Sequence, residues 1–293
     1  CETGDLFHSP RMIVSHSRDI KTKLEASIAG AVAARILSRS SHARITHVFD
    51  KSFYAEVGDQ LICVLAEDFL NGPINICVNE IPRILDVGTC IEISSTKAKI
   101  WEPIKFGPIN ADRLFENLPE TYRKDLIEAK SLLPKSLSSP LFKTIAQPAL
   151  IDLCLFLRDK KTAPVPAIKS LLGLGPGLTP SGDDFLIGMM LVLHTVGEKD
   201  LFLKLAKIVK NFASLQTSSI SNAHLSAMTD SAQANCLLHE LLFALQGKKS
   251  IKQALIRAEN FGHSSGKDAI AGIITALFAL RQRHPPLNRK IMF

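Results

Sequence analysis

The 293-residue chain has few aromatic side chains that could stack on nucleobases, since it contains one Trp and two Tyr beside 15 Phe. Proteins that bind single strands interleave basic residues with such aromatics. The net charge of +7 lies entirely in residues 151–293, partly in a basic terminal stretch and partly along one amphipathic helix. The composition therefore argues against nucleic acid as a partner, and small anionic molecules make better use of a positive field.

The sequence also lacks a long apolar run. The longest, from Ala269 to Leu280, contains a glycine and falls well short of the roughly 20 residues that a membrane-spanning helix needs. The first residues carry the acids Glu2 and Asp5, without the basic region and apolar stretch of a secretory signal. We therefore expect a cytoplasmic protein with no membrane association.

Cysteine pairs at metal-binding or redox spacing are absent too. No CxxC pair occurs, and no histidine lies near a cysteine at zinc-ligand spacing. We expect six free thiols and no zinc site, with Cys63, Cys77 and Cys90 in the core because they lie in apolar, strand-like runs. The six cysteines are Cys1, Cys63, Cys77, Cys90, Cys154 and Cys236.

The chain is long enough for two domains. Helical spacing of apolar residues predicts a first helix over 23–37, and from residue 110 to the end only helical periodicity remains. We predict an α+β protein with a β-rich domain over 1–109, containing this one early helix, and an all-helical domain over 110–293. Short runs rich in Val, Ile, Phe and Tyr predict strands at 45–49, 53–57, 61–66, 74–78, 90–93 and 97–101.

The most informative segment is a loop with four glycines and two prolines in residues 173–182. Such a composition, between two apolar helical runs, predicts unusual backbone dihedrals and a close approach to another group. The loop has no lysine of a Walker motif, and Leu178 stands where a dinucleotide fingerprint needs glycine. The common phosphate-binding loops are therefore excluded.

The pattern SGxDxxxG occurs twice, beginning at Ser181 and at Ser265, and each copy opens an apolar helix. One interpretation is structural: Ser followed three residues later by an acid forms a capping box, and the later glycine lets helices pack closely. The other is functional. If the two helices pack side by side through Gly188 and Gly272, both positive N-terminal ends converge on one cleft and form an anion site.

The capping box explains neither Asp183 nor the cluster from Gly262 to Ser264. At the rim of such a cleft, Asp183 is a candidate ligand for an amine or a divalent cation such as Mg²⁺, and His263 is a candidate proton carrier. A third polar stretch, from Thr217 to His224, either caps a helix through Ser218 or Ser219 or binds an amide or carboxylate. No G-x-S-x-G elbow of a hydrolase is present.

These interpretations give a set of candidate site residues. Asp183 and His263 are predicted to be catalytic, and no metal-ligand set is predicted. The predicted substrate-binding residues are Gly175, Gly177, Thr179, Ser181, Gly182, Asp184, Ser218, Ser221, Asn222, Ser264, Ser265, Gly266 and Asp268.

The segments GLGPGLTPSGDDFL at 173–186 and GHSSGKD at 262–268 resemble the AllH-type subunit family of oxamate carbamoyltransferase. The resemblance implies a role in allantoin degradation and purine catabolism, where phosphate splits oxalurate into oxamate and carbamoyl phosphate. It also implies partner subunits, one of them similar to acyl-CoA synthetase folds. The expected substrate is then a small anionic ureido acid.

Two functions follow from this resemblance. In the first, the chain is a carbamoyltransferase subunit that holds its anionic substrate at the paired helix N-termini. In the second, it is a non-catalytic scaffold or regulatory subunit, and the motifs only lock two helices together. The exposure of the polar groups in the glycine loop distinguishes the two functions, because a purely structural loop buries and pairs these groups, whereas a binding site leaves them facing an open cleft. The β-rich half carries no motif and either docks a partner or covers the cleft.

Overall fold

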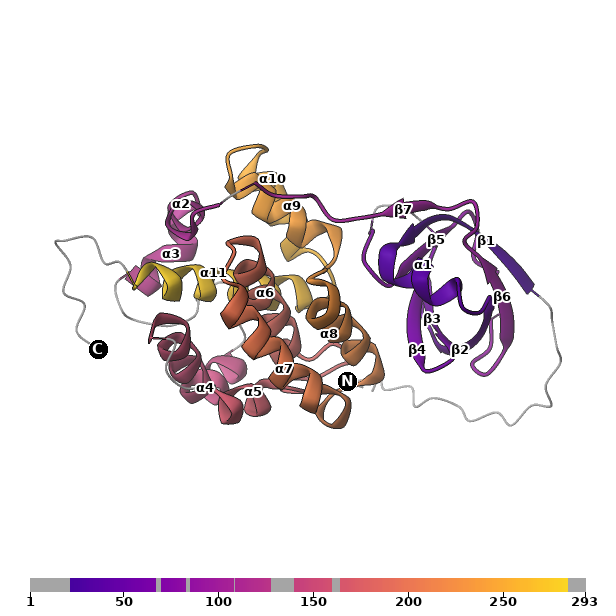
Figure 1. The fold of residues 1–293 in the computed structure, drawn as a ribbon, viewed down its shortest axis with the longest axis horizontal. Coiled ribbons are helices and arrows are strands. Elements are labelled where there is room, and N and C mark those ends of the chain that lie inside the picture. The colour runs from indigo at the N-terminus through magenta and orange to yellow at the C-terminus, as the bar shows by residue number, and fades with distance from the viewer. Residues whose placement is uncertain are drawn as a thin grey trace, which may run out of the picture.

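The computed structural model describes residues 22–66, 70–82, 85–107, 109–127, 140–159 and 164–283. Within them, the strands lie before residue 102 and the long helices follow (Figure 1). The predicted α+β class, a β-rich N-terminal part followed by an all-helical part, is confirmed.

Seven strands of the described residues form one sheet in the order β5-β4-β3-β2-β6-β1-β7. The sheet closes on itself, because β1 also pairs antiparallel with β5, and Ala29 lies opposite Ile76. Closure pairs β5 with a strand on each side, leaves β7 at an edge beside β1, and encloses an apolar interior that includes Ile45, Phe53 and Ile93. The strands are β1 (Thr22–Gly30), β2 (His42–Val48), β3 (Ser52–Val57), β4 (Gln60–Leu65), β5 (Asn75–Val78), β6 (Cys90–Ser94) and β7 (Lys99–Trp101).

The predicted first helix over 23–37 is wrong in its first half. Residues Thr22–Gly30 form β1, and only α1 (Ala31–Leu37) is helical. Leu24 and Ala26 are buried while Glu25 is exposed, which is the alternation of a strand with one buried face. Pairing of β1 with β5, β6 and β7 outweighs the local helical spacing.

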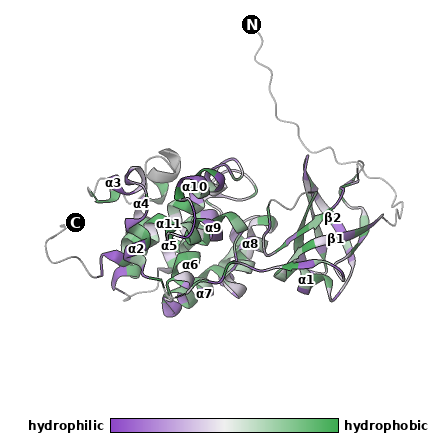
Figure 2. Ribbon diagram, turned by 90° about the horizontal axis from the view of Figure 1, so that it is seen from above, coloured by the Kyte–Doolittle hydropathy of each residue, from purple (hydrophilic) through white to green (hydrophobic). Residues whose placement is uncertain are grey.

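Ten helices of the described residues follow the barrel, and α6 and α11 lie at their centre (Figure 1). These two helices are mostly apolar, as Figure 2 shows, and are buried over most of their length. Apolar faces of the surrounding helices cover them and form the helical core. The helices are α2 (Ala111–Glu116), α3 (Glu120–Ile127), α4 (Pro140–Asp159), α5 (Val165–Leu171), α6 (Ser181–Thr195), α7 (Lys199–Gln216), α8 (Ser219–Ser231), α9 (Cys236–Leu245), α10 (Ile251–Glu259) and α11 (Ser265–Arg281).

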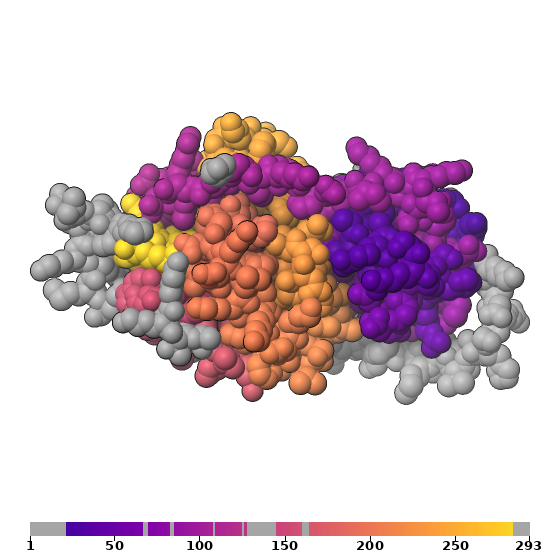
Figure 3. Space-filling view, in the orientation of Figure 1, coloured from indigo at the N-terminus to yellow at the C-terminus, as the bar shows by residue number. Residues whose placement is uncertain are grey.

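The barrel joins the helical part through several contacts between described residues, of which the segment that leaves β7 makes the first. The chain after β7 runs over the surface of the helices (Figure 3), where Trp101 and Phe106 contact the buried ring of His239, each with ring centroids 6.2 Å apart. Helix α8 makes the second connection: Ala227 packs in the barrel's apolar cluster, whereas Leu225 and Met228 pack in the helical core. The barrel is therefore held directly against the bundle.

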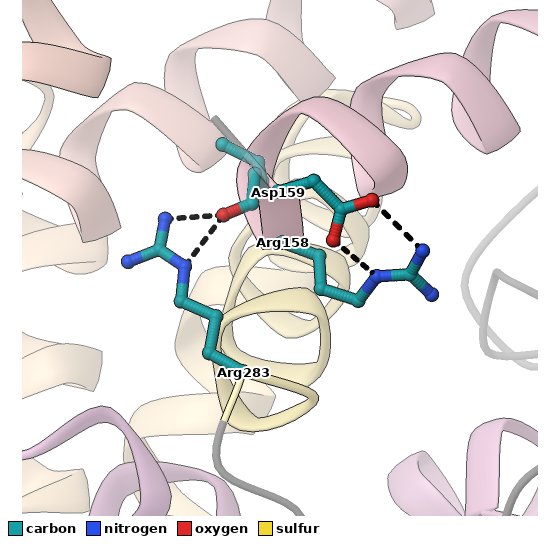
Figure 4. Close-up of polar contacts among 4 residues, drawn as sticks. Arg158, Asp159 and Arg283 are labelled. Atoms are coloured by element: carbon teal, nitrogen blue, oxygen red, sulfur yellow. Dashed lines mark hydrogen bonds and ion pairs between the residues drawn. The ribbon is translucent and has the colours of Figure 1, made fainter. Parts of the chain in front are cut away.

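Arginines secure the carboxyl end of α4 (Figure 4). Arg283, just beyond α11, donates from Nε to the carbonyl oxygen of Leu157 at 2.7 Å, and Arg158 donates to the carboxylate of Asp159 at 2.7 Å and 3.0 Å. Cations and donors at a helix carboxyl end satisfy its last carbonyl groups. The ends of α4 and α11 are joined in this way.

The thiol and membrane predictions can be compared with the described residues. Among the described residues, Cys63, Cys77, Cys90, Cys154 and Cys236 form no disulfide, whereas Cys1 lies outside the described residues. Cys63 and Cys77 are buried as predicted, but Cys90 is exposed because it begins β6 on the outward-facing side. None of the described helices is both long and apolar enough to cross a bilayer.

Candidate functional site

Helices α6 and α11 pack through their glycines in a reciprocal way. A Cβ on Gly188 would lie 1.9 Å from the carbonyl oxygen of Ala269, and a Cβ on Gly272 would lie 2.0 Å from that of Phe185. The predicted close packing is confirmed. Both N-termini meet at the same end, where the hydroxyl oxygens of Thr179 and Ser265 are 2.8 Å apart.

The capping-box interpretation is wrong for both helices. Helix α6 has Pro180 at its N-cap, α11 has Ser264, and neither has a side-chain hydrogen bond at the cap. The serines and acids act across the helix pair instead. The hydroxyl of Ser265 interacts with the carboxyl group of Asp184, and the hydroxyl of Ser181 interacts with that of Asp268.

Asp183 is fully buried and its carboxylate accepts three hydrogen bonds. The donors are the backbone N–H of Gly173 at 2.9 Å, the hydroxyl of Ser221 at 2.7 Å, and the hydroxyl of Thr217. Burial raises the pKa of Asp183, and these three donors oppose the rise. Asp183 thus ties the glycine loop to the end of α7 and the start of α8.

The glycine loop has the unusual backbone that its composition predicts. Gly173, Gly175 and Gly177 all have positive φ values, of 72°, 124° and 92°, which side chains other than glycine rarely adopt. The close approach at Gly173 is to the end of α7, because a Cβ there would lie 2.1 Å from the carbonyl oxygen of Gln216. Residues 175–178 are exposed.

A cavity of about 310 Å³ lies where the barrel meets the N-termini of α6 and α11. The barrel therefore covers one side of the cleft, which is one of the two roles that the sequence left open for it. Among the described lining residues there is no Lys or Arg. The polar lining residues are Ser52, Tyr54 and Asn75 from the barrel and Thr179, Asp184, His224, Gln233, Asn235 and Ser265 from the helical part.

Asp184 contributes a carboxyl group to the wall of this cavity. It is 9% exposed, and its Oδ2 is buried without a hydrogen-bond partner. Burial raises the pKa of Asp184 well above its usual range; the hydroxyl of Ser265 opposes the rise, and the nearby carboxyl groups of Asp268 and Asp183 add to it. An unpaired buried carboxyl oxygen costs folding free energy, and a ligand that pairs with it would recover that cost.

The same wall carries another unpaired acceptor. The side-chain oxygen of Gln233 is buried without a partner, and Gln233 also lines the cavity. Asp268, the counterpart of Asp184 in the second motif, likewise has an unpaired Oδ2 and a pKa raised by burial. It does not line the cavity, so the two motifs are equivalent in packing but not in access to the cavity.

Tyr54 and His224 also line the cavity but are not among the residues predicted from the sequence. Their side chains meet across the domain contact, with the Tyr54 hydroxyl 3.3 Å from His224 Nε2. Burial raises the pKa of Tyr54 well above its usual range and lowers that of His224 to about 4. His224 ends the polar stretch noted in the sequence, but no periodicity could pair it with a strand residue 170 positions away.

Three other predicted residues, His263, Ser218 and Asn222, do not line this cavity. His263 is exposed and does not line it, although its neighbour Gly262 does. Ser218 caps α8 by accepting from the N–H of Ser221, as the structural interpretation predicts. Asn222 lines a separate groove of about 160 Å³.

The glycines at the second position of each motif allow close helix contacts. A Cβ on Gly182 would lie 2.0 Å from the carbonyl oxygen of Leu171, and a Cβ on Gly266 would lie 1.7 Å from that of Ala258. Ser264 interacts with Asp268. No group of three or more His, Cys, Asp or Glu side chains in the described parts of the chain is placed to hold a metal ion.

Comparison with known protein families finds a match that covers the two motifs of this site. Residues 171–277 match the family model described as oxamate carbamoyltransferase subunit AllH. The match contains both SGxDxxxG motifs and α8, whereas the barrel lies outside it. The resemblance noted in the sequence is thereby confirmed for this region. No solved structure matches the chain.

Proposed function

We propose that this chain is a subunit of a carbamoyltransferase that acts on oxamate, oxalurate or a related small ureido acid together with carbamoyl phosphate, and that the interdomain cavity binds the substrate. The match over residues 171–277 supports the reaction class. The single observation that carries the choice of site is Asp184, a buried carboxyl group with an unpaired oxygen in the wall of a partly open cavity with a mostly apolar lining.

The lining chemistry suits a carbamoyl group. Such a group presents N–H donors and a carbonyl acceptor in one plane. The residues that line the cavity include Asp184 and Gln233, each with a buried unpaired oxygen, and the hydroxyl-bearing Thr179 and Ser265. Burial favours the protonated form of Asp184, in which it donates to an oxygen of the ligand. Fixed groups of this kind orient the carbamoyl carbon toward its acceptor.

The negative group of the substrate is proposed to lie beside the paired N-termini of α6 and α11, whose aligned peptide dipoles attract negative charge. The amide of Gly182 already donates to the carbonyl oxygen of Leu174, and the amides of Asp183 and Asp184 donate to that of Pro180. The helix ends therefore act through their electric field more than through free N–H groups. A protonated Asp184 adds no negative charge to oppose it.

In this proposal Asp183 is a positioning residue that holds the glycine loop, and Asp184 takes the ligand-facing place. His263 remains the candidate proton carrier, because it is exposed and adjoins Gly262 of the cavity wall. The family description names a subunit, so we propose that other subunits complete the reaction. If His263→Ala left the activity of the assembled complex unchanged, the proton-carrier role would be abandoned.

A thermal-shift screen tests the proposal on the isolated full chain. A ligand that binds only the folded state at about 100 times its Kd stabilises that state by about 2.7 kcal/mol. We expect oxamate, oxalurate or carbamoyl phosphate to raise the melting temperature of the wild type and of the exposed control Asp152→Ala, but not that of Asp184→Ala, which removes both carboxyl oxygens. Inorganic phosphate and Mg²⁺ complete the screen.

A shift that Asp184→Ala retains would place the ligand elsewhere and contradict this site. The scaffold function is the second candidate, and Asp183 favours it, because the hydrogen bonds of its carboxylate serve to lock the loop. The scaffold function predicts no shift with any of these ligands and an unchanged rate in a complex that contains Asp184→Ala.

A further inference from the structure

In the wall of the cavity, Tyr54 of the barrel makes a polar contact with His224 of the bundle. Tyr54 lies on β3 and His224 on α8, and both line the cavity that Asp184 also lines. The hydroxyl oxygen and Nε2 are 3.3 Å apart, and the rings meet edge to face with centroids 6.4 Å apart. The barrel thus contributes a polar group to the site.

The surroundings hold Tyr54 in one orientation. Its ring packs edge to face on His47 and Phe49, with centroids 6.4 Å and 6.1 Å away, and Cys63 lies opposite it on β4. The charged and titratable groups that face the hydroxyl are Cys63, His224 and Asp184. Asp184 therefore lies close enough to Tyr54 to influence it electrostatically.

Both members of the pair are neutral at physiological pH, since burial lowers the pKa of His224 to about 4 and raises that of Tyr54. A neutral imidazole carries its proton on one nitrogen only. If Nε2 carries it, His224 donates to the Tyr54 oxygen, and the hydroxyl hydrogen can go to the ligand or to the Cys63 thiol. If Nδ1 carries it, Tyr54 donates to His224 and presents only lone pairs to the cavity.

We propose that Tyr54 is a ligand-binding residue that contacts, from the barrel side, the same ligand that Asp184 contacts from the bundle side, and that His224 positions its hydroxyl group. This inference rests on the proposed function. It gives the barrel, which lies outside the matched family region, a part in ligand binding. The tautomer of His224 then decides whether the barrel offers the ligand a donor or an acceptor.

The test is calorimetric titration of the full chain with oxamate, oxalurate, carbamoyl phosphate and inorganic phosphate. Loss of one hydrogen bond of about 1 kcal/mol weakens binding about fivefold, so Tyr54→Phe is expected to raise Kd by about that factor. The chain has only two tyrosines, and Tyr122, whose hydroxyl donates to Glu259, provides the matched control. Tyr122→Phe is expected to leave Kd unchanged.

The positioning role of His224 has its own readouts. His224→Gln keeps an N–H donor that can reach the Tyr54 oxygen, whereas His224→Ala does not, so the glutamine variant is expected to bind more tightly than the alanine variant. In ¹⁵N spectra of histidine-labelled protein, Tyr54→Phe is expected to change the His224 nitrogen shifts, and ligand is expected to move them in the wild type only.

The outcomes separate this inference from the function on which it rests. If Asp184→Ala abolishes binding while Tyr54→Phe keeps the wild-type Kd, the proposed function stands and the role of Tyr54 is overturned. If both variants keep the wild-type Kd, or if none of the four compounds binds the wild type, both are overturned. Equal binding by His224→Gln and His224→Ala would overturn the positioning role alone.

Discussion

Asp183 and Asp184 are neighbours in the chain and have opposite surroundings. The carboxylate of Asp183 accepts three hydrogen bonds, whereas Asp184 has an unpaired oxygen and lines the cavity. Successive residues of a helix point about 100° apart, so one acid can hold the loop while the other faces the cavity. The two residues should therefore respond differently to substitution.

Asp183→Ala is expected to destabilise the fold. It removes one acceptor from Gly173, Thr217 and Ser221, and three lost hydrogen bonds at about 1 kcal/mol each give about 3 kcal/mol. Urea unfolding measures the loss, with Asp152→Ala on the exposed surface of α4 as the control. A free energy of unfolding equal to that of the wild type would contradict the structural role.

Asp184→Asn is expected to stabilise the fold at high pH. Burial raises the pKa of Asp184 well above its usual range, so the folded state retains a proton that the unfolded chain releases at lower pH. The contribution of Asp184 to the stability of the wild type is therefore fully present below the usual pKa of an aspartate. It is lost as the pH rises from that value toward the raised pKa of the folded state.

The asparagine variant does not titrate and therefore does not lose this stability. For the wild type, the lost free energy of unfolding is about 1.4 kcal/mol for each unit by which the pKa is raised. Its free energy of unfolding should exceed that of the wild type at pH 8 and match it at pH 4. Denaturant unfolding at both pH values provides the comparison, with Asp152→Asn as the control. Parallel pH profiles for the wild type and Asp184→Asn would show that Asp184 is not held in this environment.

The sequence points to the site region but not to the role of each residue. Asp184, Thr179 and Ser265 are among the predicted residues and line the cavity, because the glycine motifs mark where two helices meet. Which of two adjacent acids faces the cavity depends on the rotation of α6 against its neighbours. Tyr54 and His224 come together only through the domain contact, which one sequence does not reveal.

At the scale of elements, the reciprocal pair of α6 and α11 sets the position of the cavity. Each helix uses the last glycine of its motif to approach a backbone carbonyl group of the other. The pair brings Thr179 and Ser265 into contact. The spacing of glycines in the two motifs therefore determines both the helix packing and the location of the polar wall.

Gly188→Ala and Gly272→Ala are each expected to destabilise the fold by about 1 to 3 kcal/mol, the usual cost of overpacking a core. A new Cβ would lie 1.9 Å or 2.0 Å from a carbonyl oxygen, so the helices must separate. Thermal unfolding measures the effect, and Gly107→Ala, which has no atom within 4 Å of the new Cβ, should be neutral. Wild-type stability in both core variants would contradict the packing.

The helical elements were easier to predict than the barrel. Apolar periodicity predicts only helices after residue 110, and the long helices α6, α7 and α11 lie in that part of the chain. In contrast, β1 has helix-compatible spacing and is a strand because three other strands pair with it. Closure of the sheet is a non-local property, and short strands carry little information about which strand lies beside which.

At the scale of the whole molecule, α8 determines how the barrel meets the bundle. Ala227 is 2% exposed within the barrel's apolar cluster, while Leu225 and Met228 belong to the helical core. One helix thus belongs to both cores and carries His224 of the cavity wall. The cavity exists only while these cores remain in contact.

Ala227→Glu is expected to separate the barrel from the bundle, because a buried, unpaired carboxylate costs far more free energy than the alanine contact provides. Helix content by circular dichroism should stay near that of the wild type, the radius of gyration from X-ray scattering should increase, and ligand-induced thermal shifts should disappear. Ser214→Glu, on the exposed face of α7, is the charge-matched control. An unchanged radius of gyration together with retained ligand shifts would contradict the interface.

We propose that the cavity between the barrel and the bundle, around Asp184, binds the carbamoyl substrate, and a crystal structure of the full chain grown with oxamate tests this most directly. We predict ligand density in the cavity, within hydrogen-bonding distance of Asp184 Oδ2 and of the Tyr54 hydroxyl. Oxamate bound outside this cavity, or a cavity that holds only water at an oxamate concentration that raises the melting temperature, would contradict the claim.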